Sequence, residues 1–179
     1  MTWPTKKFEE VLEYEQPTNY LVSSTEYKDE FLTPVLTAGK TFILGNTNEK
    51  NGIFPKEKLP VIIFDDFTTA TKFVDFPFKV KSSAMKILHA KKNEADVKFL
   101  FYKMQTIKLT HDQHKRYWIS EYSKIEIPLP SIREQKRIVK KIEKLFAKIN
   151  EAKKLNAEVT EELKALTASI LNKAFNGEI

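Results

Sequence analysis

The sequence predicts an α+β protein, in which a globular mixed α/β domain is followed by one long helix of the coiled-coil type. Residues 1–130 alternate short apolar runs with turn signals and hold most of the 13 Phe and all 6 Tyr. Residues 131–179 instead repeat apolar side chains at alternating spacings of four and three. We therefore divide the 179 residues into a globular domain at 1–130 and a long helix at 131–179.

The start of the long helix is marked by the segment Ile127-Pro128-Leu129-Pro130-Ser131. A proline has no N–H to give to a helix interior, so the two prolines end the preceding segment. Ser131 and Glu134 have the S-x-x-E spacing of a capping box, in which each side chain accepts the backbone N–H near the other. At 1.5 Å per residue, about 40 residues would make a helix of roughly 60 Å.

A heptad seam follows the capping box and predicts that this helix pairs with another helix. The segment 131–154 carries nine basic and three acidic residues, whereas 155–179 carries two basic and four acidic residues. An antiparallel pair opposes these unlike charges, so we expect an antiparallel partner, either a second copy or a sister chain. Asn156 is a polar break at an a position that would help to fix the register. The residues expected to pair are Ile142, Leu145, Ile149, Ala152, Asn156, Val159, Leu163, Leu166 and Ile170.

Composition and charge favour a nucleic-acid surface in the middle of the chain. The net charge is +6, and residues 72–116 hold ten Lys and one Arg against four acids, while residues 1–30 hold three Lys against seven acids. A solvated lysine-rich surface is the alternative interpretation.

The absence of cysteine excludes disulfides, thiol nucleophiles and Cys-based zinc sites, and it fits a cytoplasmic protein. No apolar run has the length of a membrane span, and residues 1–7 lack the apolar core of a signal peptide.

Short strands separated by turns are expected through most of the domain. Residues 6–15 predict a short helix or turn, and residues 35–45 predict a β-rich run with Gly39 and Gly45 as turns at its two ends. Asn51-Gly52 is a strong hairpin signal. Further along we expect a buried strand at 61–64, a polar loop at 65–70, an edge or bulged strand at 73–80, a strand or helical turn at 83–88, a helix at 93–105 and a basic aromatic loop at 111–118.

Two sequence motifs suggest catalysis, but each has a more ordinary interpretation. Gly39-Lys40-Thr41 resembles the end of a phosphate-binding loop, yet the glycine needed five residues earlier is replaced by Pro34, so a tight turn is favoured. Asp65-Asp66 follows an apolar strand, as in some metal-dependent nucleases. The further acid and lysine that such a site needs are only loosely spaced, so we expect the Asp pair to cap a turn.

The three histidines do not predict a metal site. His111 and His114 are three residues apart, but the only other histidine is His89 and there is no cysteine. Beside Lys115 and Arg116, they fit phosphate and base contacts better. We expect neither catalytic residues nor metal ligands in this chain.

Basic residues interleaved with hydroxyl, amide and aromatic side chains are the candidates for DNA contact. Lys and Arg neutralise phosphates, while Asn, Thr, Ser and Arg can contact base edges. The candidates are Lys40, Thr41, Asn46, Asn48, Lys50, Asn51, Thr68, Thr69, Thr71, Lys72, Lys79, Lys81, Ser82, Lys86, His114, Lys115, Arg116 and Tyr117.

Several of these segments resemble the specificity (S) subunits of type I restriction–modification systems. The segment from Pro130 to Val139 is similar to the P-x-x-x-E-Q-x-x-I-V signature that closes a target recognition domain and opens a long conserved-region helix in that family. Residues 34–41, 60–68 and 115–120 look like segments of one class of those domains. The resemblance covers essentially the whole chain.

The resemblance implies a non-catalytic DNA-binding subunit. Each recognition domain would recognise a short half-site in the major groove, and the paired helices would set the spacing between half-sites. The implied partners are double-stranded DNA, methyltransferase (modification) subunits and translocating nuclease (restriction) subunits. S-adenosylmethionine, ATP and Mg²⁺ would belong to those partner subunits, with no cofactor in this chain. Part of the helix seam would then be available to the methyltransferase.

One departure from the family concerns the number of domains. The family norm is two recognition domains and two long helices, whereas this chain has one of each, so we expect a half-subunit or a truncated half. The partner stays open among a second copy, another half-subunit and a missing second half of the same chain. Two rival functions also stay open: a dimeric DNA-binding regulator that acts without a methyltransferase, and a nuclease with its site near Asp65.

Overall fold

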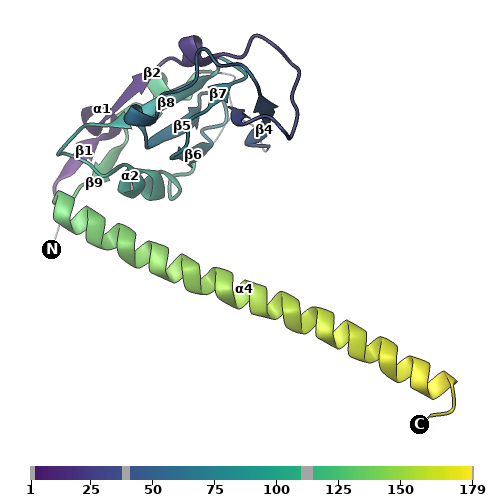
Figure 1. Cartoon of the computed structure of the whole chain (residues 1–179). Helices are drawn as coiled ribbons and strands as arrows, with labels where there is room; N and C mark the ends of the chain where they lie inside the picture. The colour runs from purple at the N-terminus through teal and green to yellow at the C-terminus, as the bar shows by residue number, and fades with distance from the viewer. Residues whose placement is uncertain (1–2, 38–40, 110–114, 179) are drawn as a thin grey trace. The chain divides into compact units, whose positions relative to one another are not determined.

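The computed structural model describes residues 3–37, 41–109 and 115–178 and confirms the predicted α+β class with its long C-terminal helix. The chain divides into two compact units, Met1–Arg137 and Ile138–Ile179. The strands are β1 (Thr5–Lys7), β2 (Leu12–Glu15), β3 (Thr33–Leu36), β4 (Ile43–Thr47), β5 (Val61–Asp65), β6 (Thr71–Val74), β7 (Lys79–Val80), β8 (Met85–Ala90) and β9 (Glu126–Pro128) (Figure 1). The helices are α1 (Phe8–Val11), α2 (Val97–Met104), α3 (Tyr117–Ser120) and α4 (Ile132–Phe175), with 3₁₀ turns η1 (Pro17–Tyr20), η2 (Lys56–Lys58) and η3 (Tyr122–Lys124).

A four-stranded antiparallel sheet with the order β2-β8-β5-β6 forms the centre of the first unit. All five residues of β5 are buried, as its run of branched apolar residues predicts. In the edge strand β6, Lys72 is exposed and Val74 is buried. The hydrophobic core cluster of the first unit is made by Tyr20, Leu36, Phe54, Val61, Ile63, Val74, Phe78, Val80, Met85 and Ile87.

Two smaller sheets complete the first unit. In the order β4-β3-β7, β3 pairs antiparallel with β4 and parallel with β7. β1 pairs antiparallel with β9, so the strand that directly precedes the long helix lies on the first strand of the chain. The Leu129 N–H donates to the Pro4 carbonyl at 2.7 Å and extends this pairing toward the helix.

Two predictions about the first unit are met only in part. The short helix predicted within residues 6–15 is confirmed as α1, in which Phe8 and Val11 are buried, but the predicted range also includes parts of β1 and all of β2. The strand expected at 73–80 is divided into β6 and β7, which belong to different sheets, with Pro77 in the gap. Proline cannot donate to a sheet ladder, which explains the interruption.

The predicted turn at Gly45 and the predicted hairpin at Asn51-Gly52 are also corrected by the structure. Gly45 lies within β4 opposite Val35, and a Cβ built there would be 2.7 Å from Tyr27 Cβ, so close packing rather than a turn requires glycine. Asn51-Gly52 joins no hairpin, since β5 pairs with β6 and β8. Gly52 has φ +64° and faces the Asn19 carbonyl, which makes it a loop position for glycine.

The predicted helix at 93–105 is confirmed in a shorter form as α2. The Asp96 side chain caps it by accepting the Phe99 N–H at 2.9 Å, so the helix begins after this residue. Leu100 and Met104 are buried, as their spacing predicts.

The first unit contains a buried ion pair between β8 and the turn after β5. Lys86 Nζ is 3.2 Å from Asp66 Oδ2, and the two side chains are only 1% and 2% exposed. The two atoms are close enough for an ion pair but do not have the geometry of a hydrogen bond. The Lys86 ammonium also lies 4.9 Å from the Tyr14 ring centroid. A charge buried in this way depends strongly on its partner, because desolvation penalises an isolated ion.

The long helix α4 confirms the predicted helical segment. Within its first turn the Glu134 N–H donates to Ser131 Oγ at 3.4 Å, which is one half of the predicted capping box. The Glu134 carboxylate accepts hydrogen bonds from the Arg137 guanidinium instead of completing the box. At the other end, Gly177 has φ +74° and the Glu178 N–H donates to the Lys173 carbonyl, the pattern of a Schellman motif.

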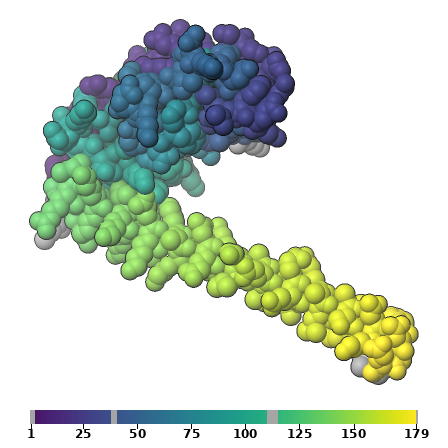
Figure 2. All heavy atoms as spheres, in the orientation of Figure 1, coloured from purple at the N-terminus to yellow at the C-terminus, as the bar shows by residue number. Residues whose placement is uncertain are grey.

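The second unit, drawn in green to yellow in Figure 2, is a helix whose heptad seam is exposed. The predicted seam residues that are roughly half exposed are Leu145, Ile149, Val159, Leu163, Leu166 and Ile170. Phe146 and Leu155 flank the seam, are similarly exposed and were not predicted. None of the helices in the described parts of the chain combines the length and apolar character that crossing a membrane requires.

Replacement of the buried lysine tests the ion pair. Lys86→Met should lower the free energy of unfolding by about 3–5 kcal/mol, because it leaves the Asp66 carboxylate buried without a cation. The double variant Lys86→Met/Asp66→Asn should recover part of this loss. Urea unfolding followed by circular dichroism measures both, with the exposed Lys50→Met as the matched control. A Lys86→Met variant as stable as that control would contradict the prediction.

Candidate nucleic-acid interface

Two of the predicted contact segments are tethered to the turn that follows β5. The Asp66 carbonyl accepts the Tyr117 N–H at 2.8 Å, and Asp66 Oδ1 accepts the Trp118 N–H at 2.9 Å. The Asp66 N–H donates to the Ala84 carbonyl at 3.3 Å. One residue therefore brings the segments around 82–84 and 115–118 to the turn at 65–70.

The turn itself is organised by Asp65, as the sequence predicts. Asp65 Oδ1 accepts the N–H groups of Phe67 and Thr68 at 2.9 and 3.3 Å. Thr69 adopts φ +57° beside it, and Thr68 is left exposed at the tip. Both aspartates of the pair thus have structural partners, and the described residues contain no group of three or more potential metal ligands.

The end of the β3–β4 hairpin approaches the same turn. Lys72 Nζ, at the start of β6, lies 5.7 Å from the Phe42 ring centroid. Thr37 donates its N–H to the Phe42 carbonyl and its hydroxyl to the Thr41 carbonyl, at 2.9 and 2.6 Å. Thr41 therefore lies near Lys72, although the two residues are far apart in the sequence.

We define the Asp66 cluster as the exposed predicted residues that these contacts bring together: Thr41, Thr68, Lys72, Ser82 and Arg116. Thr69, Thr71 and Lys115 lie in the same segments and are half-buried. Thr71 accepts a hydrogen bond from Gln105, and Lys115 pairs with Glu121. The cluster presents cations and hydroxyl groups, which suit a phosphate backbone and base edges.

Lys81 is an exposed predicted residue at the edge of this region. Its N–H donates to the Leu36 carbonyl at 2.9 Å, and its ammonium lies 5.9 Å from the Tyr27 ring centroid. The cation–aromatic contacts of Lys72, Lys81 and also Lys98, which lies 5.3 Å from Phe73, hold basic side chains on the surface. The sequence shows that basic and aromatic residues are interleaved, but it does not show which of them are in contact. Lys98 was therefore not among the predicted contact residues.

A second group of predicted residues lies at the other end of the β3–β4 hairpin. In this group Asn46 lies opposite Pro34 within β4, and Asn48, Lys50 and Asn51 follow the Thr33–Thr47 register pair. Between them, Glu49 accepts the backbone N–H groups of Ser23 and Ser24, and it pairs with Lys79 at 2.8 Å. The hydrogen bond from Lys79, with those N–H groups, holds the pKa of Glu49 below its usual range. The structure does not bring this group to the Asp66 cluster through any of the contacts described above.

Three predicted contact residues are buried and are corrected here. Lys86 is 0% exposed and paired with Asp66, and Lys79 is 3% exposed, with Glu49 and the Asn51 carbonyl as its partners. Tyr117 is 1% exposed. Side chains enclosed in this way cannot reach a DNA phosphate or base, so we remove them from the interface. Gly39, Lys40, His111 and His114 lie outside the described residues.

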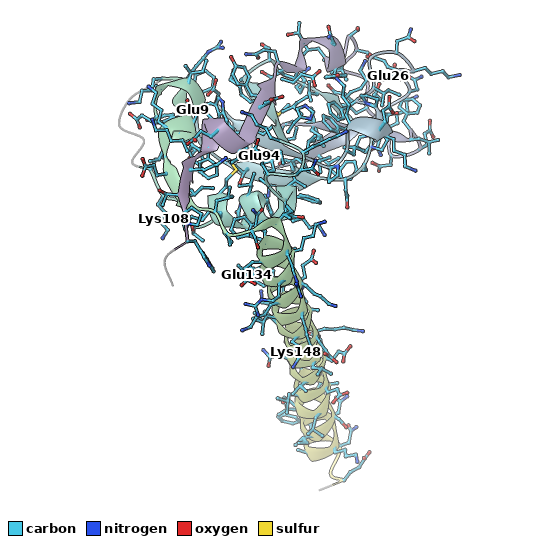
Figure 3. The ribbon with its side chains drawn as sticks, turned by 90° about the vertical axis from the view of Figure 1, so that its left-hand side faces the viewer. Glu9, Glu26, Glu94, Lys108, Glu134 and Lys148 are labelled. Carbon is cyan, nitrogen blue, oxygen red and sulfur yellow. The ribbon has the colours of Figure 1, made fainter. Side chains whose placement is uncertain are left out.

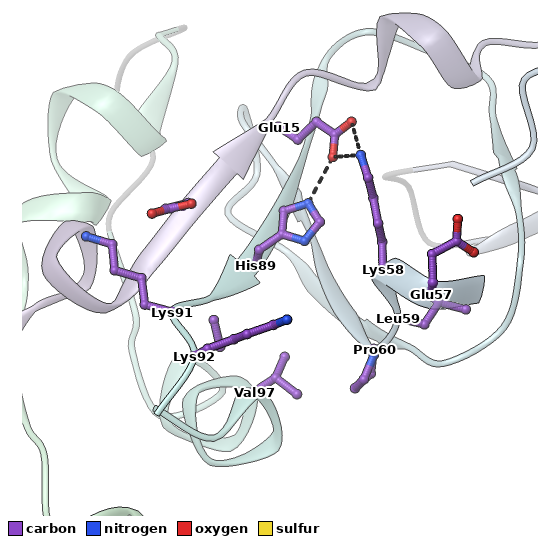
Figure 4. Close-up of a pocket in the computed structure, with 11 residues that line it drawn as sticks. Glu15, Glu57, Lys58, Leu59, Pro60, His89, Lys91, Lys92 and Val97 are labelled. Carbon is purple, nitrogen blue, oxygen red and sulfur yellow. Dashed lines mark hydrogen bonds and ion pairs between the residues drawn. The ribbon is translucent and has the colours of Figure 1, made fainter. Parts of the chain in front are cut away.

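A cavity of about 750 Å³ is lined by Glu15, Lys58 and His89, which belong to a separate polar cluster (Figure 4). Glu15 accepts from the Tyr20 hydroxyl at 2.7 Å and from Lys58 at 3.2 Å, and its Oε2 lies 3.0 Å from His89 Nε2. Burial alone would raise the pKa of Glu15, but the hydrogen bonds from Tyr20, Lys58 and His89 outweigh it and lower that pKa. These groups satisfy one another and tie β2, β8, η1 and η2 together, which indicates a structural role.

Comparison with known proteins shows that this chain matches a known protein family. Residues 1–161 match the family described as the type I restriction modification DNA specificity domain. The chain is 48% identical over 164 residues to the type I restriction enzyme EcoR124I/EcoR124II specificity subunit of Escherichia coli, which covers 86% of this chain and 39% of that subunit. It is 45% identical over 53 residues to the EcoBI specificity subunit of Escherichia coli, which covers 30% of this chain and 11% of that subunit.

Solved structures share the fold. A chain from a study of complex assembly and conformational transition in the type I R-M system has a TM-score of 0.71 at 19% identity, over 97% of this chain and 46% of that one. The HsdS subunit from Thermoanaerobacter tengcongensis has a TM-score of 0.59 at 18% identity, over 99% of this chain and 46% of that one. The chain thus spans less than half the length of these relatives. It belongs to the family of type I restriction–modification DNA specificity subunits, which are non-catalytic.

Proposed function

We propose that this chain recognises one half-site of an interrupted DNA target, through the Asp66 cluster, for a type I restriction–modification system. The observation that carries the proposal is the convergence of separate basic and hydroxyl-bearing segments on the turn after β5. Family membership supports DNA as the ligand, because the matched family is defined as a DNA specificity domain. The division into a recognition domain at 1–130 and a spacing helix at 131–179 belongs to the same proposal.

Within the cluster, we assign phosphate contact first to Lys72 and base contact first to Arg116. Lys72 is a point charge, with its ammonium held against an aromatic ring. Arg116 is exposed and is followed directly by two residues whose backbone N–H groups are fixed on Asp66. A guanidinium on such a fixed segment is suited to bidentate contact with guanine in the major groove.

The helix α4 supplies the second part of the proposal. Its exposed apolar seam matches the surface that a coiled-coil partner would cover, and its basic first half and acidic second half favour an antiparallel partner. We propose pairing with a second copy of this chain through that seam. DNA methylation and restriction would be carried out by the methyltransferase and nuclease subunits, which would bring S-adenosylmethionine, ATP and Mg²⁺.

Removal of the Arg116 guanidinium tests the base contact. Arg116→Ala should weaken binding to the specific site by about 1–3 kcal/mol and leave binding to random DNA nearly unchanged. Fluorescence anisotropy on both DNAs at matched salt measures the difference, with Lys56→Ala as control, because Lys56 is exposed and is not a predicted contact residue. Equal loss on both DNAs would make Arg116 a phosphate contact.

A charge within the seam tests the pairing of the helix. Leu163→Lys should convert the pair to single chains at micromolar concentration, because it places an ammonium at an a position of the seam. Ala165→Lys, which adds the same side chain off the seam, should leave the pairing intact. Sedimentation equilibrium distinguishes the two states. If the unmodified chain sediments as a monomer, the second-copy proposal fails.

The methylome of a restriction-free host tests the function as a whole. Co-expression of this chain with its neighbouring methyltransferase subunit should produce an adenine-methylated, interrupted palindrome, because identical chains would recognise identical half-sites. Single-molecule sequencing measures the motif. A motif with two unrelated halves would refute pairing with a second copy. Tight sequence-specific binding by the chain alone, with no methylation, would favour a regulator.

A further inference from the structure

Gln135 is a fully buried polar side chain at the start of α4, and its amide has three hydrogen bonds. Gln135 Oε1 accepts the Asp96 N–H at 2.8 Å. Gln135 Nε2 donates to the Pro130 carbonyl at 2.8 Å and to the Glu94 carbonyl at 3.2 Å. Both amide hydrogens and the amide oxygen are therefore used, although the side chain is 0% exposed.

The partners of Gln135 belong to two separate segments of the first unit. Glu94 and Asp96 directly precede α2, and Asp96 is the capping residue of that helix. Pro130 lies two residues before the start of α4. Figure 3 labels Glu94 and Glu134, which lie on the two segments that this side chain joins. Glu94 is fixed in turn by its ion pair with Lys6 of β1 at 3.0 Å.

The start of α4 does not need the Gln135 side chain for its own capping. The Gln135 N–H donates to the Ser131 carbonyl at 2.9 Å, and the Glu134 N–H donates to Ser131 Oγ. Of the three bonds of the side chain, two go to residues 39 and 41 positions earlier in the sequence. Its amide therefore links the first turn of the helix to the body of the domain.

We propose that Gln135 is a positioning residue for the spacing of the DNA target. It fixes the first turn of α4 to the segment before α2, so that paired chains accept only one separation between their half-sites. This inference rests on the proposed function, because a spacing exists only if two domains bind one DNA. It differs from base recognition, since Gln135 is buried and cannot contact DNA.

Loss of the amide should loosen this link without altering the Asp66 cluster. Gln135→Met keeps the length of the side chain but leaves the Asp96 N–H and the Pro130 and Glu94 carbonyls without their buried partner. These backbone groups can form hydrogen bonds again only with water, and water can enter only if the first turn of α4 moves. Arg137→Ala is the matched control, because Arg137 lies on the same helical start and is exposed.

The test compares methylomes produced with the unmodified chain, Gln135→Met and Arg137→Ala, each co-expressed with the methyltransferase subunit. We expect Gln135→Met to methylate the same half-sites at the original spacing and at spacings changed by about one base pair, or 3.4 Å along the duplex. Arg137→Ala should keep the original spacing alone. Full methylation at an unchanged spacing, or uniformly weaker methylation with no new spacing, would overturn the proposal.

Hydrogen exchange of the purified chains gives a second readout that does not depend on DNA. Amides in the first turns of α4 should exchange on the order of tenfold faster in Gln135→Met than in the unmodified chain or Arg137→Ala. Unchanged protection would also overturn the proposal. If the unmodified chain itself directs no methylation, the proposed function fails, while the exchange rates still show whether Gln135 holds the helix start.

Discussion

The Asp66 carboxylate is the group on which the candidate interface depends. It lies at the end of the fully buried strand β5, where one oxygen faces the Lys86 ammonium and the other accepts the Trp118 N–H. Its backbone carbonyl accepts the N–H of Tyr117, next to Trp118, and its backbone N–H donates to the Ala84 carbonyl. Because the acid is enclosed, its charge requires the lysine, and the lysine in turn requires the acid. The positions of Arg116 and of the 82–84 segment thus follow from one buried charge pair.

The lysines of this domain have two physically different environments. Lys79 and Lys86 are buried, and each is neutralised by an acid, so they add structure but no surface charge. Lys72 and Lys81 lie on aromatic rings with their charge at the surface, where it can attract phosphate. The basic middle of the sequence is therefore only partly available to a ligand.

The long helix presents a different physical problem, since its apolar seam has no cover within the second unit. An exposed Leu or Val on a single helix gains little from burial until a partner helix arrives, so the stability of the seam is tied to association. At the other end of the helix, a buried glutamine makes the link to the domain through three hydrogen bonds. A protein that recognises two half-sites at a fixed distance would need both the pairing seam and this link. If the helices paired but were loosely linked to their domains, the distance between the half-sites would not be defined.

The sequence by itself determined the elements whose cause is local. The Pro-x-Pro and Ser131 segment predicts the start of α4, the heptad spacing predicts its seam, and the apolar run predicts β5. The tertiary structure decided which lysines are paired with acids, since Asp66 and Lys86 meet only when β5 and β8 are adjacent. It also decided that Gly45 serves close packing, and that Gln135 reaches across 39 residues to Asp96. These features depend on contacts between distant segments, which no local spacing encodes.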